Sequence, residues 1–392
     1  MIVKDLWTLP DGVNEIPPEQ ALPLERLRRK ILDKFLVHGY ELVSSPLFEF
    51  LDSLLVGVGN EMDLETIKFV DQLSGKMMGL RADITPQIAR FEAHSRNKNC
   101  PDRLCYVGNI GKARGQGVHL NRSPVQIGAE LFGHVGVASD IEVVKLMLDI
   151  LADSNLSQVS LDLGHVGIFK ALVSLAKLNS SQEQDIVIVL QKRSVEDLTK
   201  LLCTLNIDEK VMKMFLSLIG LQGGFEVIDL GYEQLDTSIK PIKEALQDLK
   251  KLAFEIKKHN PDQIIHFDLS ELRGYKYHTG LIFAAYVEHF GMSIAKGGRY
   301  DAIGEVFGKK SAATGFSANL DVLNMLSNNY EVKELIFAPN VEDENLDKLI
   351  AKLRSQKRAV VVELPNQVGT SQEMGCTHEL LLIDNLWQLK VL

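Results

Sequence analysis

The sequence has few cysteines, and their spacing does not indicate a metal site or a disulfide framework. Its four cysteines, Cys100, Cys105, Cys203 and Cys376, include no CxxC pair, which is typical of free thiols in a reducing compartment. No apolar run approaches the roughly 20 residues of a transmembrane helix. The first segment, MIVKDLWTLPDGVNEIPPEQ, lacks the apolar core of a signal peptide. We therefore expect a cytoplasmic protein without a membrane anchor.

Motifs of several common enzyme classes are absent as well. The chain contains no P-loop, no HExxH, no GxSxG and no cysteine–histidine spacing of the zinc type. Gly57 and Gly59 begin a pattern like the dinucleotide fingerprint, but Met62 stands where the third glycine belongs. No strong strand precedes these glycines either. We expect no metal site and no bound cofactor.

The composition is that of an acidic globular protein. The chain has 392 residues, of which 45% are apolar and 24% charged, so it can form two or three domains. Its net charge of −9 argues against broad, non-specific affinity for nucleic acid. A local basic site is compatible with this total.

Hydrophobic periodicity predicts a sheet domain that is interrupted by a block of helices. Residues 165–258 show almost only helical spacing and are expected to be an insertion in a domain over residues 1–328. Residues 329–392 are expected to form a small α/β domain. The predicted helices cover 18–38, 49–55, 137–152, part of 312–326 and 342–353. The predicted strands cover 40–46, a hairpin at 67–84, 104–107, 124–132, 158–162, 281–287, the start of 312–326, 335–338, 359–364 and the apolar stretch 380–383.

The stretch from residue 103 to 133 combines two predicted strands with a glycine-rich, cationic loop. The loop carries Lys112, Arg114, His119 and Arg122 among its glycines, which allow close approach of the backbone to a ligand. In the second strand, period-two alternation places Gln126, Gly128 and Glu130 on one face. An acid and an amide on a buried face need a partner, and a ligand with an ammonium group would provide one. A solvated sheet face is the alternative.

Two further segments carry polar groups at places where ligands commonly bind. Asp83 ends a predicted strand, and Thr85-Pro86 opens a predicted helix with threonine as N-cap. Residues 273–280, RGYKYHTG, form a dense cluster of polar and aromatic side chains. Ordinary capping is the alternative explanation for Asp83 and Thr85.

Four segments in this order resemble the catalytic domain of histidyl-tRNA synthetase. They are RADITPQIAR, VQIGAE, LRGYKYHTG and KGGRYD, and the resemblance covers roughly residues 18–328. It implies the α+β fold of class II synthetases, an antiparallel sheet flanked by helices. It also implies a dimer assembled through the first helix and strand.

The chain departs from this family at the positions that bind ATP. Class II synthetases use an arginine in motif 2 and another in motif 3, but this chain has Lys112 and Val322 there. Arg114 also replaces an expected acidic residue. Lysine cannot copy the bidentate fork of arginine, and valine offers no charge at all. The resemblance therefore implies a chain without catalytic residues for adenylation.

Positions that correspond to histidine-binding residues are kept. His278 stands where the synthetase usually has a second tyrosine, and Lys112 or Arg273 is expected near the carboxylate of histidine. The resemblance implies a histidine-binding site made of Asp83, Thr85, Lys112, Gln126, Glu130, Arg273, Tyr277 and His278.

The phrases ELRGYKYHTGLIFAAY and PVQIGAELFGH are more similar to one branch of this family, the ATP phosphoribosyltransferase regulatory subunits. This resemblance implies a non-catalytic subunit of the first step of histidine biosynthesis. It would activate a short-form catalytic subunit, mediate feedback inhibition by histidine, and assemble as a dimer within a hetero-oligomer, expected to be a hetero-octamer. No tRNA partner is expected. The alternatives are a histidyl-tRNA synthetase and another synthetase-like paralogue that acts on RNA.

Overall fold

The computed structural model describes residues 8–57, 60–96, 100–115, 121–156, 158–327 and 334–392. The chain separates into two compact units, residues 1–328 and 329–392, and each is described by itself. Among the described helices, none is long and apolar enough to cross a membrane.

The first unit is built on a mixed, mostly antiparallel sheet of nine described strands. In spatial order these are β1 (Glu41–Leu42), β5 (Asp102–Asn109), β6 (Val125–Phe132), β12 (Ala313–Asn319), β11 (Ser293–Arg299), β10 (Leu281–Val287), β7 (Val159–His165), β9 (Ile264–Asp268) and β8 (Gln222–Gly223). Only the β1–β5 and β7–β9 pairs are parallel. The expected α+β fold is confirmed.

Helices cover one face of this sheet and form the main core with it. They are α1 (Pro18–Val37), α5 (Val137–Asp153), α11 (Lys240–His259) and α12 (Leu320–Leu326). Ile127, Ala129 and Leu131 of β6 point to this side and are fully buried with α5. Alternation along the strand therefore leaves the even-numbered side chains of β6 on the second face.

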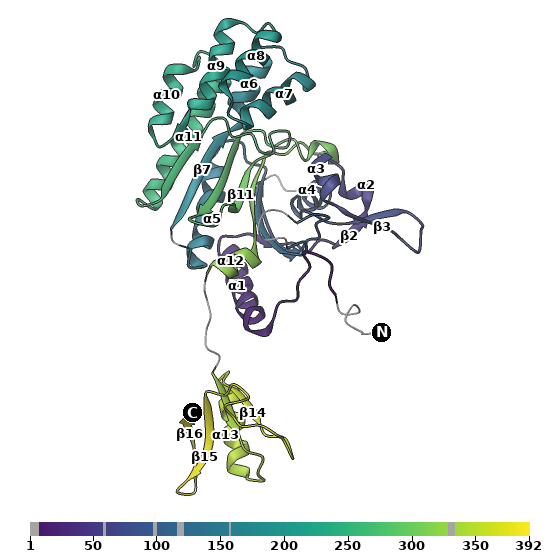
Figure 1. The fold of residues 1–392 in the computed structure, drawn as a ribbon, viewed down its shortest axis with the longest axis vertical. Helices are drawn as coiled ribbons and strands as arrows, with labels where there is room; N and C mark the ends of the chain where they lie inside the picture. Colours follow the sequence, from purple (N-terminus) through teal and green to yellow (C-terminus); the bar gives the residue numbers. More distant parts are fainter. Residues whose placement is uncertain (1–7, 58–59, 97–99, 116–120, 157, 328–333) are drawn as a thin grey trace. The chain divides into compact units, whose positions relative to one another are not determined.

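The predicted block of helices is present. Figure 1 shows α6–α10 gathered at one end of the sheet. Their bounds are α6 (Val166–Leu175), α7 (Ser180–Gln191), α8 (Val195–Thr204), α9 (Glu209–Gly220) and α10 (Glu226–Gln234). Local signals fix the starts of α7 and α9, because Asn179 forms a capping box with Gln182 and Asp208 caps α9. The two-residue strand β8 within the block was not predicted.

A smaller three-stranded sheet and the helix α4 lie beside the other end of the main sheet (Figure 1). The elements are β2 (Phe48–Phe50), α2 (Leu51–Leu54), α3 (Asn60–Glu65), β3 (Ile67–Val70), β4 (Met77–Leu80) and α4 (Thr85–Ser95), and a 3-10 turn follows later at Glu305–Phe307. The helix predicted over 49–55 is wrong at its start, because residues 48–50 pair with β4. Thr85 is not the N-cap of α4; Ile84 holds that position, and the Thr85 hydroxyl bonds elsewhere.

The second unit has a four-stranded sheet in the order β14-β13-β15-β16, with a core against one helix. Its elements are β13 (Leu335–Ala338), α13 (Glu344–Ser355), β14 (Ala359–Val362), β15 (His378–Ile383) and β16 (Leu386–Val391). The strand β16 was missed by the sequence prediction. Trp387 of β16 packs on the core and donates from Nε1 to Asp343, which caps α13.

Candidate functional site

Polar and small side chains share the second face of the main sheet. Strand pairing aligns Glu130 of β6 with Gly315 of β12, and Gly315 with Gly298 of β11. The glycines make room for larger groups above them, since a Cβ at Gly315 would overlap the carboxylate of Glu130. A Cβ at Gly298 would lie 2.7 Å from Nδ1 of His278. Gly298 and Gly315 therefore form the base of the candidate site, below the side chains of Glu130 and His278.

Glu130 is the buried acid of the site and is 1% exposed. Its Oε1 accepts hydrogen bonds from the hydroxyls of Thr85 (2.9 Å) and Tyr106 (3.3 Å). Tyr300 donates to Oε2. Burial raises the pKa of Glu130 to about 8, although these hydroxyls favour the charged form. The alternative of a solvated sheet face is wrong, because the Gln126 and Glu130 side chains are buried.

Asp83 and Gln126 form a second, more accessible polar pair. Gln126 donates from Nε2 to Oδ1 of Asp83 (3.0 Å) and accepts from the amide of Ile84 (2.9 Å). The Thr85 amide also donates to Oδ1 of Asp83 at 3.0 Å. In the described part of the chain, the hydrogen bonds that Asp83 accepts all end on Oδ1. Since Asp83 is half-buried, its Oδ2 can accept from a bound cation.

Arg81 anchors the turn that carries Asp83 and Thr85. It donates from Nε to the carbonyl of Asn109 (2.8 Å) and from Nη1 to the carbonyl of Ser45 (2.7 Å). Ser45 in turn donates to Gln87 of α4 (2.9 Å). These bonds fix the start of α4 against β5, so the Thr85 hydroxyl is held where it meets Glu130.

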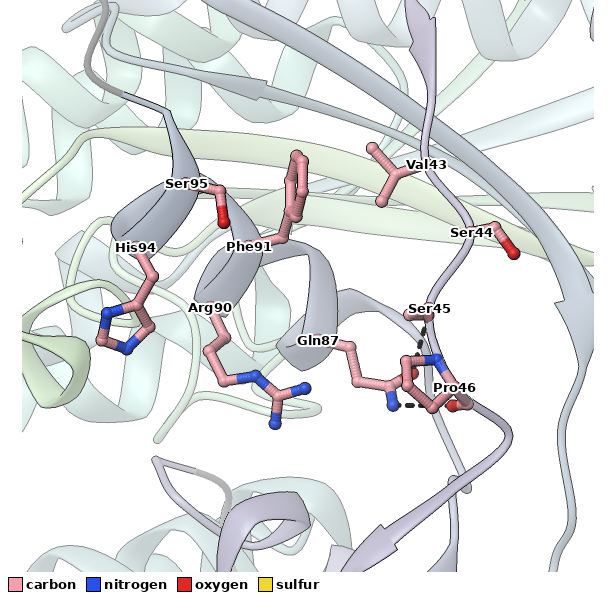
Figure 2. A pocket seen from close by; sticks show the side chains of 9 residues that line it. All are labelled: Val43, Ser44, Ser45, Pro46, Gln87, Arg90, Phe91, His94 and Ser95. Carbon is pink, nitrogen blue, oxygen red and sulfur yellow. Dashed lines mark hydrogen bonds between the residues drawn. The ribbon is translucent and has the colours of Figure 1, made fainter.

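A hollow beside this anchor is separate from the candidate site. It lies between α4 and the segment before β2, as Figure 2 shows. Two of its polar side chains are already engaged, because Gln87 bonds to Pro46 and both Gln87 and Arg90 bond to Glu49. None of the residues predicted for the candidate site lines this hollow.

Tyr277 and His278 bring unsatisfied polar atoms to the site. The Tyr277 ring stacks on Tyr300, with centroids 5.1 Å apart and planes 26° apart. The Tyr277 hydroxyl and Nδ1 of His278 are buried without a hydrogen-bond partner in the described residues. Burial lowers the pKa of His278 to about 4, so its ring is neutral. Unpaired buried polar atoms are costly, and a polar ligand would satisfy them.

Two residues predicted for the site have other partners. Nζ of Lys112 lies 3.3 Å from Oε2 of Glu65, and the Lys112 backbone pairs with Arg122. Arg273 donates to Glu271 at 2.8 and 2.6 Å and to the hydroxyl of Tyr286 at 2.7 Å. The structure thus brings together Asp83, Thr85, Gln126, Glu130, Tyr277 and His278. His119 lies outside the described residues.

Sequence reasoning missed Tyr106 and Tyr300. Tyr106 pairs directly with Gly128 across β5 and β6, so correct strand pairing would have placed it on the same face. Tyr300 belongs to the segment KGGRYD, but only the folded sheet shows that its hydroxyl reaches Glu130. No group of three or more potential metal ligands occurs in the described ranges.

Comparisons with known proteins divide the chain at nearly the same place as the two units. A family model described as histidyl-tRNA synthetase matches residues 12–323. A model described as ATP phosphoribosyltransferase subunit HisZ C-terminal domain matches residues 333–390. The ATP phosphoribosyltransferase regulatory subunit of Alkalilimnicola ehrlichii is 44% identical over 95% of this chain and 94% of its own length. The chain belongs to the family of ATP phosphoribosyltransferase regulatory subunits. A second member, from Nitrosococcus oceani, is 44% identical over 99% of this chain and 98% of its own length.

Solved structures show how this family folds. One from Bacillus halodurans, titled ATP phosphoribosyltransferase regulatory subunit/histidyl-tRNA synthetase, has a TM-score of 0.82 and 26% identity, covering 94% of this chain and 96% of its own. Histidyl-tRNA synthetase from Nostoc has a TM-score of 0.77 and 16% identity over 96% of this chain and 91% of its own, which shows the fold alone. The class II synthetase-like fold is therefore shared by the regulatory subunits.

Proposed function

We propose that this chain is the regulatory, non-catalytic subunit of ATP phosphoribosyltransferase in histidine biosynthesis. It binds a short-form catalytic subunit, which transfers phosphoribose from phosphoribosyl pyrophosphate to ATP, and it raises that activity. Family membership over nearly the full chain supports this role.

Histidine is the proposed effector, and the candidate site is its proposed pocket. The pocket offers a half-buried carboxylate at Asp83 for the α-ammonium group. It offers Glu130, Tyr277 and His278 for the imidazole, whose two nitrogens can donate and accept. The observation that carries this assignment is the unsatisfied buried hydroxyl of Tyr277, which lies near the carboxyl groups of Glu130 and Asp83, with the unsatisfied Nδ1 of the adjacent His278.

The same structure supports a lack of adenylation activity. Val322, at the motif 3 position, packs on the main hydrophobic core from α12. Lys112, at the motif 2 position, forms an ion pair with Glu65. Neither group supplies the arginine clamp that positions and neutralises phosphate. The alternatives of an active synthetase and of an RNA-linked paralogue gain no support from these contacts.

Inhibition by histidine would then be allosteric, because the effector and the reaction occupy different subunits. Such inhibition is a coupling free energy between two sites, typically about 1–3 kcal/mol. We propose that the chain acts as a dimer within a cytoplasmic hetero-octamer that contains no tRNA.

Co-purification tests this function directly. A tagged full-length chain is mixed with a short-form catalytic subunit, and phosphoribosyl transfer is measured with and without histidine. We expect a stable complex, faster turnover than the catalytic subunit alone, and inhibition by histidine. A chain that neither binds the catalytic subunit nor changes its rate would contradict the proposal. Activation without histidine sensitivity would contradict only the effector role.

A further inference from the structure

Lys296 lies on the same sheet face as Glu130. In the pairing of β11 with β12, Lys296 is opposite Ser317, and Ser317 is opposite Gly128 of β6. Two residues further along β11, Gly298 is opposite Gly315 of β12, and Gly315 is opposite Glu130 of β6. Lys296 is therefore two strands from β6, about 10 Å across the face, with only small residues between them.

The charge of Lys296 is open to a ligand. Its side chain is exposed, and no hydrogen bond or ion pair joins it to another residue in the described ranges. The residue opposite it on β10 is Ala284, which leaves space on that side too. Its positive charge adds to the effect of burial in lowering the pKa of the His278 imidazole. The Lys296 ammonium thus lies close enough to the Tyr277–His278 side of the pocket to act on it.

The other cations that were expected near the carboxylate of histidine are engaged. Lys112 pairs with Glu65, and Arg273 is neutralised by Glu271. The pocket groups that do meet are Asp83, Glu130 and neutral hydrogen-bonding side chains. An amino acid bound there by its ammonium and imidazole groups would leave a carboxylate in a half-buried site. Such a group needs a cationic partner.

We propose that Lys296 binds the α-carboxylate of histidine in this pocket. The inference rests on the proposed function, because it assumes that histidine occupies the site. It assigns the ammonium group to Asp83 at one side and the carboxylate to Lys296 at the other. The flexible four-carbon stem of lysine suits this reach across small residues. Lys296 would therefore give the site its preference for an amino acid over the corresponding amine or alcohol.

Calorimetric titration of the full-length chain with histidine and with histidinol tests this role. Histidinol carries a hydroxymethyl group in place of the carboxylate and keeps the ammonium and the imidazole. We expect the wild-type chain to prefer histidine by about tenfold or more, the effect of one charge-assisted hydrogen bond. Lys296→Met should lose this preference by binding histidine more weakly and histidinol as before. Lys296→Arg should keep most of it.

The matched control is Lys251→Met, an exposed lysine on α11, which should leave both affinities unchanged. Melting temperatures of all variants should equal that of the wild-type chain, because Lys296 has no partner to lose. If Lys296→Met keeps the wild-type preference, or weakens both ligands equally, the assignment is overturned while the histidine site stands. If the wild-type chain binds neither ligand, the histidine site itself fails, and the role of Lys296 fails with it.

Discussion

Glu130 accepts from three hydroxyls on three separate elements, α4, β5 and the turn after β11. Replacing it with glutamine puts an NH2 group where one of these hydroxyls donates, and removes the carboxyl group that is proposed to meet the imidazole. Glu130 is protonated below about pH 8 in the free chain, and a bound imidazolium would stabilise its charged form. Since a hydrogen bond to a charged group contributes about 1.5–3 kcal/mol, Glu130→Gln should weaken histidine binding by roughly tenfold or more. Calorimetry measures this, with Glu288→Gln as an exposed control that should bind normally. Unchanged affinity in Glu130→Gln would rule out the pocket.

The raised pKa of Glu130 predicts a pH dependence of stability. In the folded chain this pKa is about 8, above the usual value of 4.5, so the native state binds more protons between these two values. The contribution of Glu130 to the free energy of unfolding is complete below pH 4.5 and is lost as the pH rises through 8. Between these two pKa values, the free energy of unfolding falls by at most about 1.4 kcal/mol per pH unit because of Glu130.

Urea unfolding of the wild-type chain and Glu130→Gln, compared between about pH 6 and about pH 8.5, isolates this contribution. The wild-type chain should lose stability relative to the variant as the pH rises. A constant difference between the two proteins across this range would show that Glu130 is ionised in the folded chain throughout.

At the scale of elements, the site depends on the close approach of β6 and β12. Gly315 has no side chain, and a Cβ there would meet Glu130 and the carbonyl of Ala129. We expect Gly315→Ala to abolish measurable histidine binding and to lower the melting temperature, because both neighbours would have to move. Gly220→Ala is the matched control, since a Cβ there meets nothing within 4 Å. Normal binding by Gly315→Ala would show that the carboxylate does not need this position.

The loop over residues 108–123 is our candidate relay between histidine and the catalytic subunit. Its glycines allow rearrangement. In its described part the loop carries three cations, which are Lys112, the exposed Arg114 and Arg122. Residues 116–120 lie outside the described part. We expect Lys112→Ala or Arg114→Ala to reduce activation or histidine sensitivity in the assembled complex. The control, Lys348→Ala in the second unit, should have no effect.

If both loop variants keep full activation and full inhibition, the helical block becomes the next candidate relay. It contacts the 273–280 segment directly, since Lys170 of α6 donates to the carbonyl of His278 (2.6 Å). Phe169 also packs edge-on against Tyr275, with centroids 5.9 Å apart. A movement of this segment on histidine binding would therefore reach α6.

Local signals predicted most elements, whereas the site needed long-range pairing. The helix α1 and the hairpin of β3 and β4 follow from periodicity and turn residues over short windows. The shared face of Gln126 and Glu130 follows from alternation along one strand. The partners of Glu130 do not, because their hydroxyls come from segments far apart in sequence. The ion pair that occupies Lys112 likewise depends on where α3 ends.

At the scale of the whole molecule, the chain combines a synthetase-type unit with a second unit that matches the HisZ C-terminal model. The first unit thus matches the model of an enzyme family, and the second matches the model of a regulatory-subunit domain. The proposed histidine pocket contains Asp83 and Glu130, whereas Lys112 and Val322 stand where the resemblance to synthetases implies arginines. This separation predicts that the chain binds histidine without activating it.

We therefore expect no histidine-dependent exchange of pyrophosphate into ATP by the isolated chain. Forming an adenylate requires the phosphates to be held and neutralised, and Val322 is packed on the core while Lys112 is paired with Glu65. The measurement is radiolabelled pyrophosphate exchange at saturating histidine, with a working histidyl-tRNA synthetase as positive control. The double variant Lys112→Arg/Val322→Arg tests whether the absence of these two arginines is enough to explain the lack of exchange. Exchange above background by the wild-type chain would refute the non-catalytic role, because the pocket would then bind ATP productively without either arginine.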